Sequence, residues 1–267
     1  MLPTKPETVV NCKPHLAASA ARRECPDIET SSDDYARRFA GAAGEYFLDV
    51  QARGFEYLMH GLSSSKVLDV GGGHGQLVAS FLRCNCDHTI FGSEDSTHTR
   101  IRTRFADAGI EYATGDLLHL PYPDRSFDVV VAVRLVSHIE AWRELLAEFC
   151  RVARHSVIID YPSWRSLNAL APLLFRLKKN IEKNTRLYTS FFPSRLAREL
   201  RRHGFNVSDS YGQFILPMFV HRAMSGARWL QICERASRDV GLTSLFGSPV
   251  LLRADRGPSL PNRTPCR

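Results

Sequence analysis

The 267-residue chain is 44% hydrophobic, enough for one domain with a sizeable core, and no segment approaches the about 18 consecutive apolar residues of a transmembrane helix. Its 35 Lys and Arg residues outnumber its 28 Asp and Glu residues, and we attribute the formal net charge of +7 to solvated helix faces, because the positive side chains are spread along the chain. Seven cysteines without regular spacing argue against a disulfide framework and a metal site, and they predict free thiols in the cytoplasm.

The first sixty residues predict an arm followed by helices. Residues 1–30 are rich in Pro, Ala, Thr and Lys without sustained periodicity, so we expect a flexible arm rather than a secretory signal. The run Ser-Ser-Asp-Asp at 31–34 is a helix-start signal. It introduces a short helix in which Tyr35 and Phe39 have the spacing of a packing pair, then a break at 41–44, and then a second helix.

A short apolar strand that ends in glycine is the central motif. Residues 66–76 read KVLDVGGGHGQ, and apolar residues with helical spacing follow. A strand, a glycine turn and a helix form the first half of a nucleotide-binding βαβ unit, in which glycine lets the backbone approach a ligand closely. The dinucleotide fingerprint Gly-x-Gly-x-x-Gly fails in both registers, because Gln76 and Val78 stand where its third glycine belongs. The pattern that fits is acid-x-Gly-x-Gly-x-Gly, formed by Asp69, Gly71, Gly73 and Gly75.

Acidic residues also lie close to the next predicted strands. A strand over 88–92 leads into Ser-Glu-Asp-Ser, and Glu94 lies about twenty residues beyond the glycines, where a carboxylate can bind both ribose hydroxyls. Asp95 competes with Glu94 for this role, although Asp95 suits the N-cap of the following helix, predicted over 97–108, better. Farther along, Asp116 precedes a strand over 129–133.

In order and spacing, residues 66–161 resemble the class I S-adenosylmethionine-dependent methyltransferases of the ubiquinone- and menaquinone-biosynthesis-like type. The resemblance implies a Rossmann-like α/β fold, with a seven-stranded, mostly parallel sheet, an antiparallel last strand and helices on both faces. It implies S-adenosyl-L-methionine as cofactor, with the methionine ammonium held by Asp69, the ribose by Glu94 and the adenine amino group by Asp116. The other implied cofactor-binding residues are Gly71, Gly72, Gly73, His74, Gly75, Asp95, Leu117, Arg134, Tyr35 and Arg38, the last two on a helix that folds over the cofactor in relatives.

The remaining sequence predicts helices over 139–154, 195–203 and 222–240, and strands over 156–160, 205–211 and 248–253. We therefore expect one methyltransferase domain over 31–253, with an N-terminal cap at 31–62, lid insertions at 162–192 and 218–240, and a flexible tail at 254–267. Both insertions follow the carboxyl ends of strands, where open α/β sheets bind ligands. Leucines within 167–177 share one face of a predicted lid helix, which could cover the acceptor, pack against the domain or touch a membrane.

The candidate catalytic residues follow the fourth and fifth predicted strands. Methyl transfer from a sulfonium is an in-line displacement, and a protonated acceptor also needs a base, for which His138, Asp160 and Tyr161 are candidates. The Asn/Asp-Pro-Pro-aromatic motif of nucleic-acid amino-methyltransferases is missing, which argues against a nucleic-acid partner. We predict methyl transfer to an O, N or C atom of a small, lipophilic or aromatic acceptor. An RNA or protein methyltransferase that uses the basic helices, and a catalytically silent S-adenosylmethionine-binding subunit, stay open as alternatives.

Overall fold

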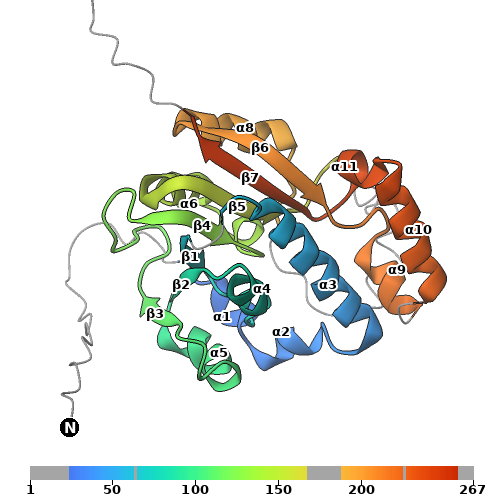
Figure 1. Ribbon diagram of the computed structural model, residues 1–267, viewed down its shortest axis with the longest axis horizontal. Helices are drawn as coiled ribbons and strands as arrows, with labels where there is room; N and C mark the ends of the chain where they lie inside the picture. The colour runs from blue at the N-terminus through green and yellow to red at the C-terminus, as the bar shows by residue number, and fades with distance from the viewer. Residues whose placement is uncertain (1–23, 63–64, 167–187, 225–226, 258–267) are drawn as a thin grey trace, which may run out of the picture.

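A single seven-stranded sheet organises the chain, and its strands lie in the order β3-β2-β1-β4-β5-β7-β6 (Figure 1). The computed structural model describes residues 24–62, 65–166, 188–224 and 227–257. The pairs among β1–β5 are parallel, whereas β7 is antiparallel to both β5 and β6. The strands are β1 Lys66–Val70, β2 Asp87–Gly92, β3 Glu111–Thr114, β4 Phe127–Ala132, β5 Ala153–Tyr161, β6 Phe205–Gly212 and β7 Val250–Arg256. The predicted fold class is confirmed.

Helices cover both faces of the sheet because side chains of the central strands alternate between the two faces. On one face, Val129 and Val131 of β4 share a core with α3 (Gly41–Leu58) and α4 (Val78–Arg83). On the other, Val130 and Ala132 share a core with α6 (Trp142–Val152) and α8 (Pro193–Arg202). The sheet is therefore buried between helical layers.

Shorter helices surround this sandwich. Helices α9 (Met218–Ala223), α10 (Arg228–Asp239) and α11 (Leu242–Phe246) form a group at one end of the molecule, beside α3 (Figure 1). The others are α1 (Asp27–Thr30), α2 (Asp33–Arg37), η1 (Asp95–His98), α5 (Thr99–Arg104) and η2 (Val136–His138). Within the described segments no helix is long and apolar enough to cross a membrane.

The start of the folded part is earlier than predicted. Residues 27–30 form α1 and Asp27 is fully buried, so the boundary of the flexible arm at residue 30 is wrong. The predicted break at 41–44 is also wrong, because α3 begins at Gly41. Glycine at 44 serves a close approach instead, since a Cβ there would lie 2.2 Å from the carbonyl carbon of Phe39. Small residues therefore permit the tight corner between α2 and α3.

The bounds of one strand and of two predicted helices also differ from the prediction. Strand β7 continues to Arg256 because Phe205 and Arg256 are register partners, so the predicted start of the tail at 254 is too early. The helix predicted over 222–240 is two helices, α9 and α10. The segment expected to be one helix over 97–108 is a 3₁₀ turn followed by the short α5. The predicted lid helix with its leucines at 167–177 lies outside the described residues.

Candidate active site

A tight glycine turn follows β1 at the carboxyl edge of the sheet. Gly71, Gly72, Gly73 and Gly75 have φ angles between +50° and +90°, a region that favours glycine. A Cβ on Gly72 would also lie 2.5 Å from Ile90 Cγ2. The turn continues the hydrogen bonding of the sheet, because the Gly71 N–H donates to the Phe91 carbonyl at 2.8 Å. The glycine turn therefore places backbone atoms without side chains at this edge of the sheet.

Asp69 places a carboxylate inside the protein just before this turn. Its side chain is 3% exposed, and burial raises its pKa to about 7. An ionised carboxylate in an apolar interior is costly unless a cation compensates it. The position of Asp69 therefore suits a cationic group of a ligand.

Glu94 and Asp95 follow β2, and the structure separates their surroundings. Asp95 forms an ion pair with Arg102 at 2.8 Å in the first turn of η1. Glu94 is exposed, and its Oε1 accepts a hydrogen bond from Ser96 Oγ at 2.5 Å. Because Asp95 has a structural ion pair, Glu94 is the better candidate for binding a ligand at this position.

Asp116 occupies the equivalent place after β3. Its Oδ1 accepts the Leu118 N–H at 3.0 Å, and its Oδ2 lies 2.9 Å from His119 Nδ1. The neighbouring Leu117 is fully buried. The strand register places Gly92 opposite Thr114, so the ends of β1, β2 and β3 bring Asp69, Glu94 and Asp116 to one edge of the sheet.

Arg134 and Asp160 meet where β4 and β5 end. The Arg134 N–H donates to Asp160 Oδ1 at 2.5 Å, and Arg134 has the left-handed φ of +63°, which this contact stabilises. Burial raises the pKa of Asp160 to about 6, against the opposing effect of Arg134. Arg134 Nη2 donates to Gln51 Oε1 at 3.3 Å, and its guanidinium lies 3.9 Å from the Phe39 ring centroid. The Asp160 carboxylate thus holds the Arg134 backbone in place, and this backbone positions the Arg134 side chain.

The N-terminal cap closes on the glycine turn through His74. Its imidazole is 3% exposed, stacks on Phe39 at 5.1 Å and lies 6.1 Å from Tyr35. Burial and nearby arginines lower the pKa of His74 to about 3, so the imidazole is neutral. Arg38 lies over the Tyr35 ring at 5.1 Å and also approaches Glu29 at 3.5 Å. The predicted Tyr35–Phe39 pair is present at 5.7 Å, and both rings reach the turn.

Three residues, Asp27, Gln51 and Glu24, were missed by the sequence analysis. Asp27 Oδ2 accepts the Ser93 N–H, just after β2, at 2.6 Å, and a Cβ on Gly71 would lie 3.8 Å from Asp27 Cβ. Its segment lacks periodicity, so the sequence held no signal for it. Gln51 is 1% exposed on the buried face of α3, and a polar residue within an apolar helical stripe was a usable signal. Glu24 adds a third contact, because its carboxylate accepts the N–H groups of Glu140 and Ala141 before α6.

Two candidates for the base, His138 and Tyr161, differ in accessibility. Tyr161 is 2% exposed in the main core, and burial raises its pKa to about 12, so its phenol does not ionise near neutral pH. His138 is half-buried at the end of η2, and its ring centroid lies 5.9 Å from that of Tyr188. His138 therefore keeps more access to solvent than Tyr161 or the buried Asp160.

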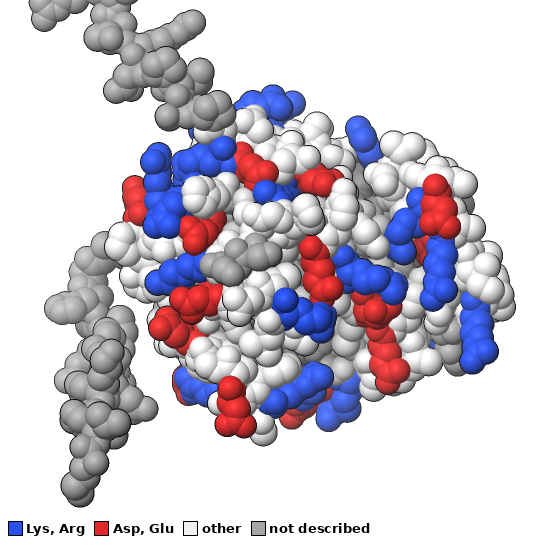
Figure 2. All heavy atoms as spheres, in the orientation of Figure 1, with Lys and Arg blue, Asp and Glu red and all other residues white. Residues whose placement is uncertain are grey.

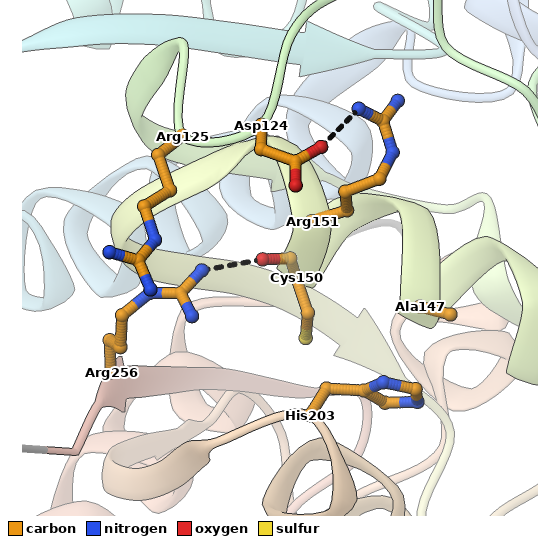
Figure 3. A pocket seen from close by; sticks show the side chains of 7 residues that line it. All are labelled: Asp124, Arg125, Ala147, Cys150, Arg151, His203 and Arg256. Atoms are coloured by element: carbon orange, nitrogen blue, oxygen red, sulfur yellow. Dashed lines mark hydrogen bonds and ion pairs between the residues drawn. The ribbon is translucent and has the colours of Figure 1, made fainter. Parts of the chain in front are cut away.

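A hollow of about 200 Å³ lies at the opposite, amino end of β4, and two of its arginines, Arg151 and Arg256, have hydrogen-bond partners (Figure 3). Arg151 pairs with Asp124 at 2.9 Å. Arg256 Nη2 donates to the carbonyls of Cys150 and Ala153, both at 2.7 Å. The hollow is lined by Asp124, Arg125, Ala147, Cys150, Arg151, His203 and Arg256. These contacts secure the C-terminal end of α6, so we assign the hollow to the scaffold.

Part of the chain matches a known domain family. Residues 68–159 match the model of a methyltransferase domain. Similar curated proteins include a sterol 24-C-methyltransferase of Gibberella zeae, 28% identical over 45% of this chain and 34% of its own length. A fatty-acid O-methyltransferase of Mycolicibacterium smegmatis is 30% identical over 46% of this chain and 52% of its own length. The chain thus spans about a third to a half of the length of these relatives.

Solved structures share the fold at low sequence identity. The magnesium protoporphyrin IX methyltransferase of Synechocystis, solved with bound S-adenosylhomocysteine, has a TM-score of 0.59 and 13% identity, over 84% of this chain and 94% of its own. A possible histamine N-methyltransferase of Thermotoga maritima has a TM-score of 0.57 and 17% identity, over 86% and 99%. The sheet order and these structural neighbours show that the chain has the fold of the methyltransferases it resembles, and residues 68–159 of it match a methyltransferase domain.

Proposed function

We propose that the protein transfers a methyl group from S-adenosyl-L-methionine to an O, N or C atom of a small lipophilic acceptor. The observation that carries the proposal is the alignment of Asp69, Glu94 and Asp116 at the carboxyl ends of three adjacent parallel strands, beside a turn of positive-φ glycines. Ligands of open α/β sheets bind at this edge.

The residues at the edge fit the chemical groups of this cofactor. Asp69, buried with a raised pKa, suits the ammonium group, and Glu94 and Asp116 suit the ribose and the adenine amino group. Gln51 Nε2, Arg134 Nη1 and His74 Nε2 are buried without a hydrogen-bond partner in the part of the chain that the structure describes. Buried donors of this kind are satisfied by an acceptor, so Gln51 and Arg134 suit the cofactor's carboxylate.

The sulfonium of the cofactor supplies an activated methyl group, so the main task of the protein is to align the acceptor with it. A neutral His74 adds no positive charge beside a sulfonium. We assign the base to His138 for acceptors that must lose a proton, because it is the most accessible of the three candidates. Asp160 is assigned a positioning role through the Arg134 backbone.

A lipophilic acceptor is supported by the relatives. The curated relatives include proteins named for sterols, fatty acids and phthiotriol dimycocerosates, the last being 32% identical over 41% of this chain. The test is incubation with S-adenosylmethionine carrying a tritiated methyl group and, in parallel, a lipid extract, a pool of polar metabolites, and RNA. We expect label in the organic phase of the lipid reaction. Label only in RNA, or in none of the three, would reject the proposed acceptor class.

The choice between Glu94 and Asp95 gives a direct test of the cofactor site. We expect Glu94→Ala to weaken S-adenosylhomocysteine binding by about 1–3 kcal/mol, because the two ribose hydroxyls lose a charged hydrogen-bond acceptor. Asp95→Ala is the matched control, since its carboxylate pairs with Arg102, and it should leave affinity nearly unchanged. Isothermal titration calorimetry measures both, and the reverse order of effects would show that Asp95 is the ligand.

A further inference from the structure

Helices α10 and α11 carry a group of large apolar side chains that no described part of the chain covers. Ile232 is 64% exposed, Val240 is 72% exposed and Leu245 is 60% exposed. We name this surface the α10–α11 apolar face. Its members are Trp229, Ile232, Val240, Leu242, Leu245 and Phe246. Scattered single apolar residues are ordinary on protein surfaces, but a contiguous group indicates an interaction site.

The pattern along α10 shows that the face is one side of an amphipathic helix. Trp229, Cys233, Ala236 and Val240 follow spacings of 4, 3 and 4 and are all exposed. The buried positions are Leu230 and Glu234, which lie on a different side of the helix. The helix therefore packs one side on the domain through Leu230 and Glu234, and its apolar stripe faces outward.

The helix is anchored firmly, so the exposure does not come from fraying. Glu234 is fully buried and accepts the N–H groups of Ile215 and Leu216, each at 2.9 Å. It also lies 3.0 Å from His221 Nε2, while Arg238 donates to the Gln213 carbonyl at 2.8 Å. These contacts hold the inner side of α10 in place, and they fix the orientation of the outer side.

The charges bordering the face are mainly positive. Arg228 and Arg235 are exposed on α10, next to the apolar stripe. Asp239 is the exposed acid of this helix, whereas Glu234 is occupied by His221 and backbone groups. Figure 2 shows blue side chains, with red ones beside them, set among white surface at the α10 end of the molecule. An apolar stripe with a tryptophan and flanking arginines complements an anionic lipid interface.

We propose that the α10–α11 apolar face docks the protein on an anionic membrane surface, where a lipophilic acceptor would be collected. The collecting role rests on the proposed function, but the docking itself does not. Helices α9–α11 follow β6 and lie beside α3, whose Gln51 contacts Arg134 at the candidate active site (Figure 1). Docking through this face would therefore bring the membrane to the side of the domain that carries the site.

The test is co-sedimentation of the full chain with vesicles of phosphatidylcholine, with and without phosphatidylglycerol. We expect wild-type protein to bind the anionic vesicles and to be released by about 0.5 M NaCl, because screening removes the arginine contribution. Ile232→Glu/Leu245→Glu should lower the partition coefficient at least tenfold. A control for a single added charge elsewhere on the surface is Leu82→Glu, an exposed leucine on α4, which should bind like wild type. Thermal melts of both variants verify that they fold.

Three results would overturn the proposal. Wild-type protein that does not sediment with anionic vesicles excludes docking. An equal loss in Leu82→Glu shows that binding is not specific to this face. A wild-type dimer in light scattering that Ile232→Glu/Leu245→Glu dissociates, without vesicle binding, assigns the face to a second copy of the chain. Because none of these readouts uses methyl transfer, a wrong acceptor class would leave the vesicle result intact.

Discussion

Replacing Asp69 by asparagine is expected to weaken S-adenosylhomocysteine binding by about 1.5–3 kcal/mol, roughly tenfold to a hundredfold, while making the protein more stable at pH 8. The two effects have one cause. Burial raises the pKa of Asp69 from 3.8 to about 7, so ionising this carboxyl is costly in the folded chain unless a ligand cation compensates it. Asparagine removes that cost and also removes the partner of the cation.

The pH dependence follows from the direction of the shift. The folded state holds a proton on Asp69 that the unfolded chain releases near pH 4, so the free energy of unfolding falls as the pH rises from about 4 to about 7. Asp69→Asn lacks this decline and should gain stability on the order of 2 kcal/mol at pH 8, with little change at pH 4. Urea titrations at the two pH values measure the difference. Equal stability of both proteins at pH 8 would contradict the raised pKa.

Ligand binding provides an independent check on the same carboxyl. Since a cation favours the ionised form, wild-type affinity for S-adenosylhomocysteine should rise between about pH 6 and pH 8, with proton release on binding near the lower end. Calorimetry in two buffers of different ionisation enthalpy counts the protons. In Asp69→Asn this proton release should disappear, and its persistence would assign it to another group, such as Asp160.

Replacing Glu234 by alanine is expected to have the largest effect on stability, a loss of about 3–5 kcal/mol. One carboxylate serves three donors: the N–H groups of Ile215 and Leu216, and the ring of His221. Both Glu234 and His221 are fully buried, so water cannot replace the lost acceptor without a rearrangement. Urea denaturation followed by circular dichroism measures the change.

Glutamine at position 234 is the matched control for this prediction. Its amide has nearly the same shape and keeps one acceptor oxygen, but its NH₂ group would face donors, so an intermediate loss is expected. Affinity for S-adenosylhomocysteine should survive in the folded fraction of both variants, because the three acids proposed to bind it follow other strands. If Glu234→Ala lowered the free energy of unfolding by less than about 0.5 kcal/mol, the hydrogen bonds of this carboxylate would contribute little to stability.

The fold could be predicted because its signals are local and repeated. The apolar run at 67–70, ended by glycines, has few alternatives to a buried strand and a turn, and β1 follows it closely. Of the three acids, Glu94 was chosen by its distance from the glycine turn, whereas the roles of Asp69 and Asp116 came from the resemblance to the methyltransferases, and all three roles stay predictions. Local patterns could not reveal contacts between residues that are far apart in sequence, such as Asp27 and Ser93. Asp27 is held by its hydrogen bond with Ser93, and its neighbours in sequence carry no signal of that contact.

The same reasoning explains the mistaken boundaries. A glycine pair at 41 and 44 predicts a break, but tertiary packing against Phe39 gives Gly44 a role inside a helix. The tail prediction failed because an edge position is set by register, and β6 supplies partners as far as Arg256. For the candidate base, the sequence offered three residues after strand ends, and only burial distinguished His138 from Asp160 and Tyr161.

The contact between Asp27 and Ser93 also sets the order in which the chain assembles. It joins residues 66 positions apart, and the contact of Glu24 with Ala141 spans 117 positions. Closing such long loops costs conformational entropy, so we expect residues 24–30 to dock after β2 and α6 have formed and to detach before the sheet opens. Hydrogen exchange can follow this detachment in the native protein. The Ser93 amide would report the opening of residues 24–30, and the Gly71 amide, bonded to Phe91, would report the opening of the sheet.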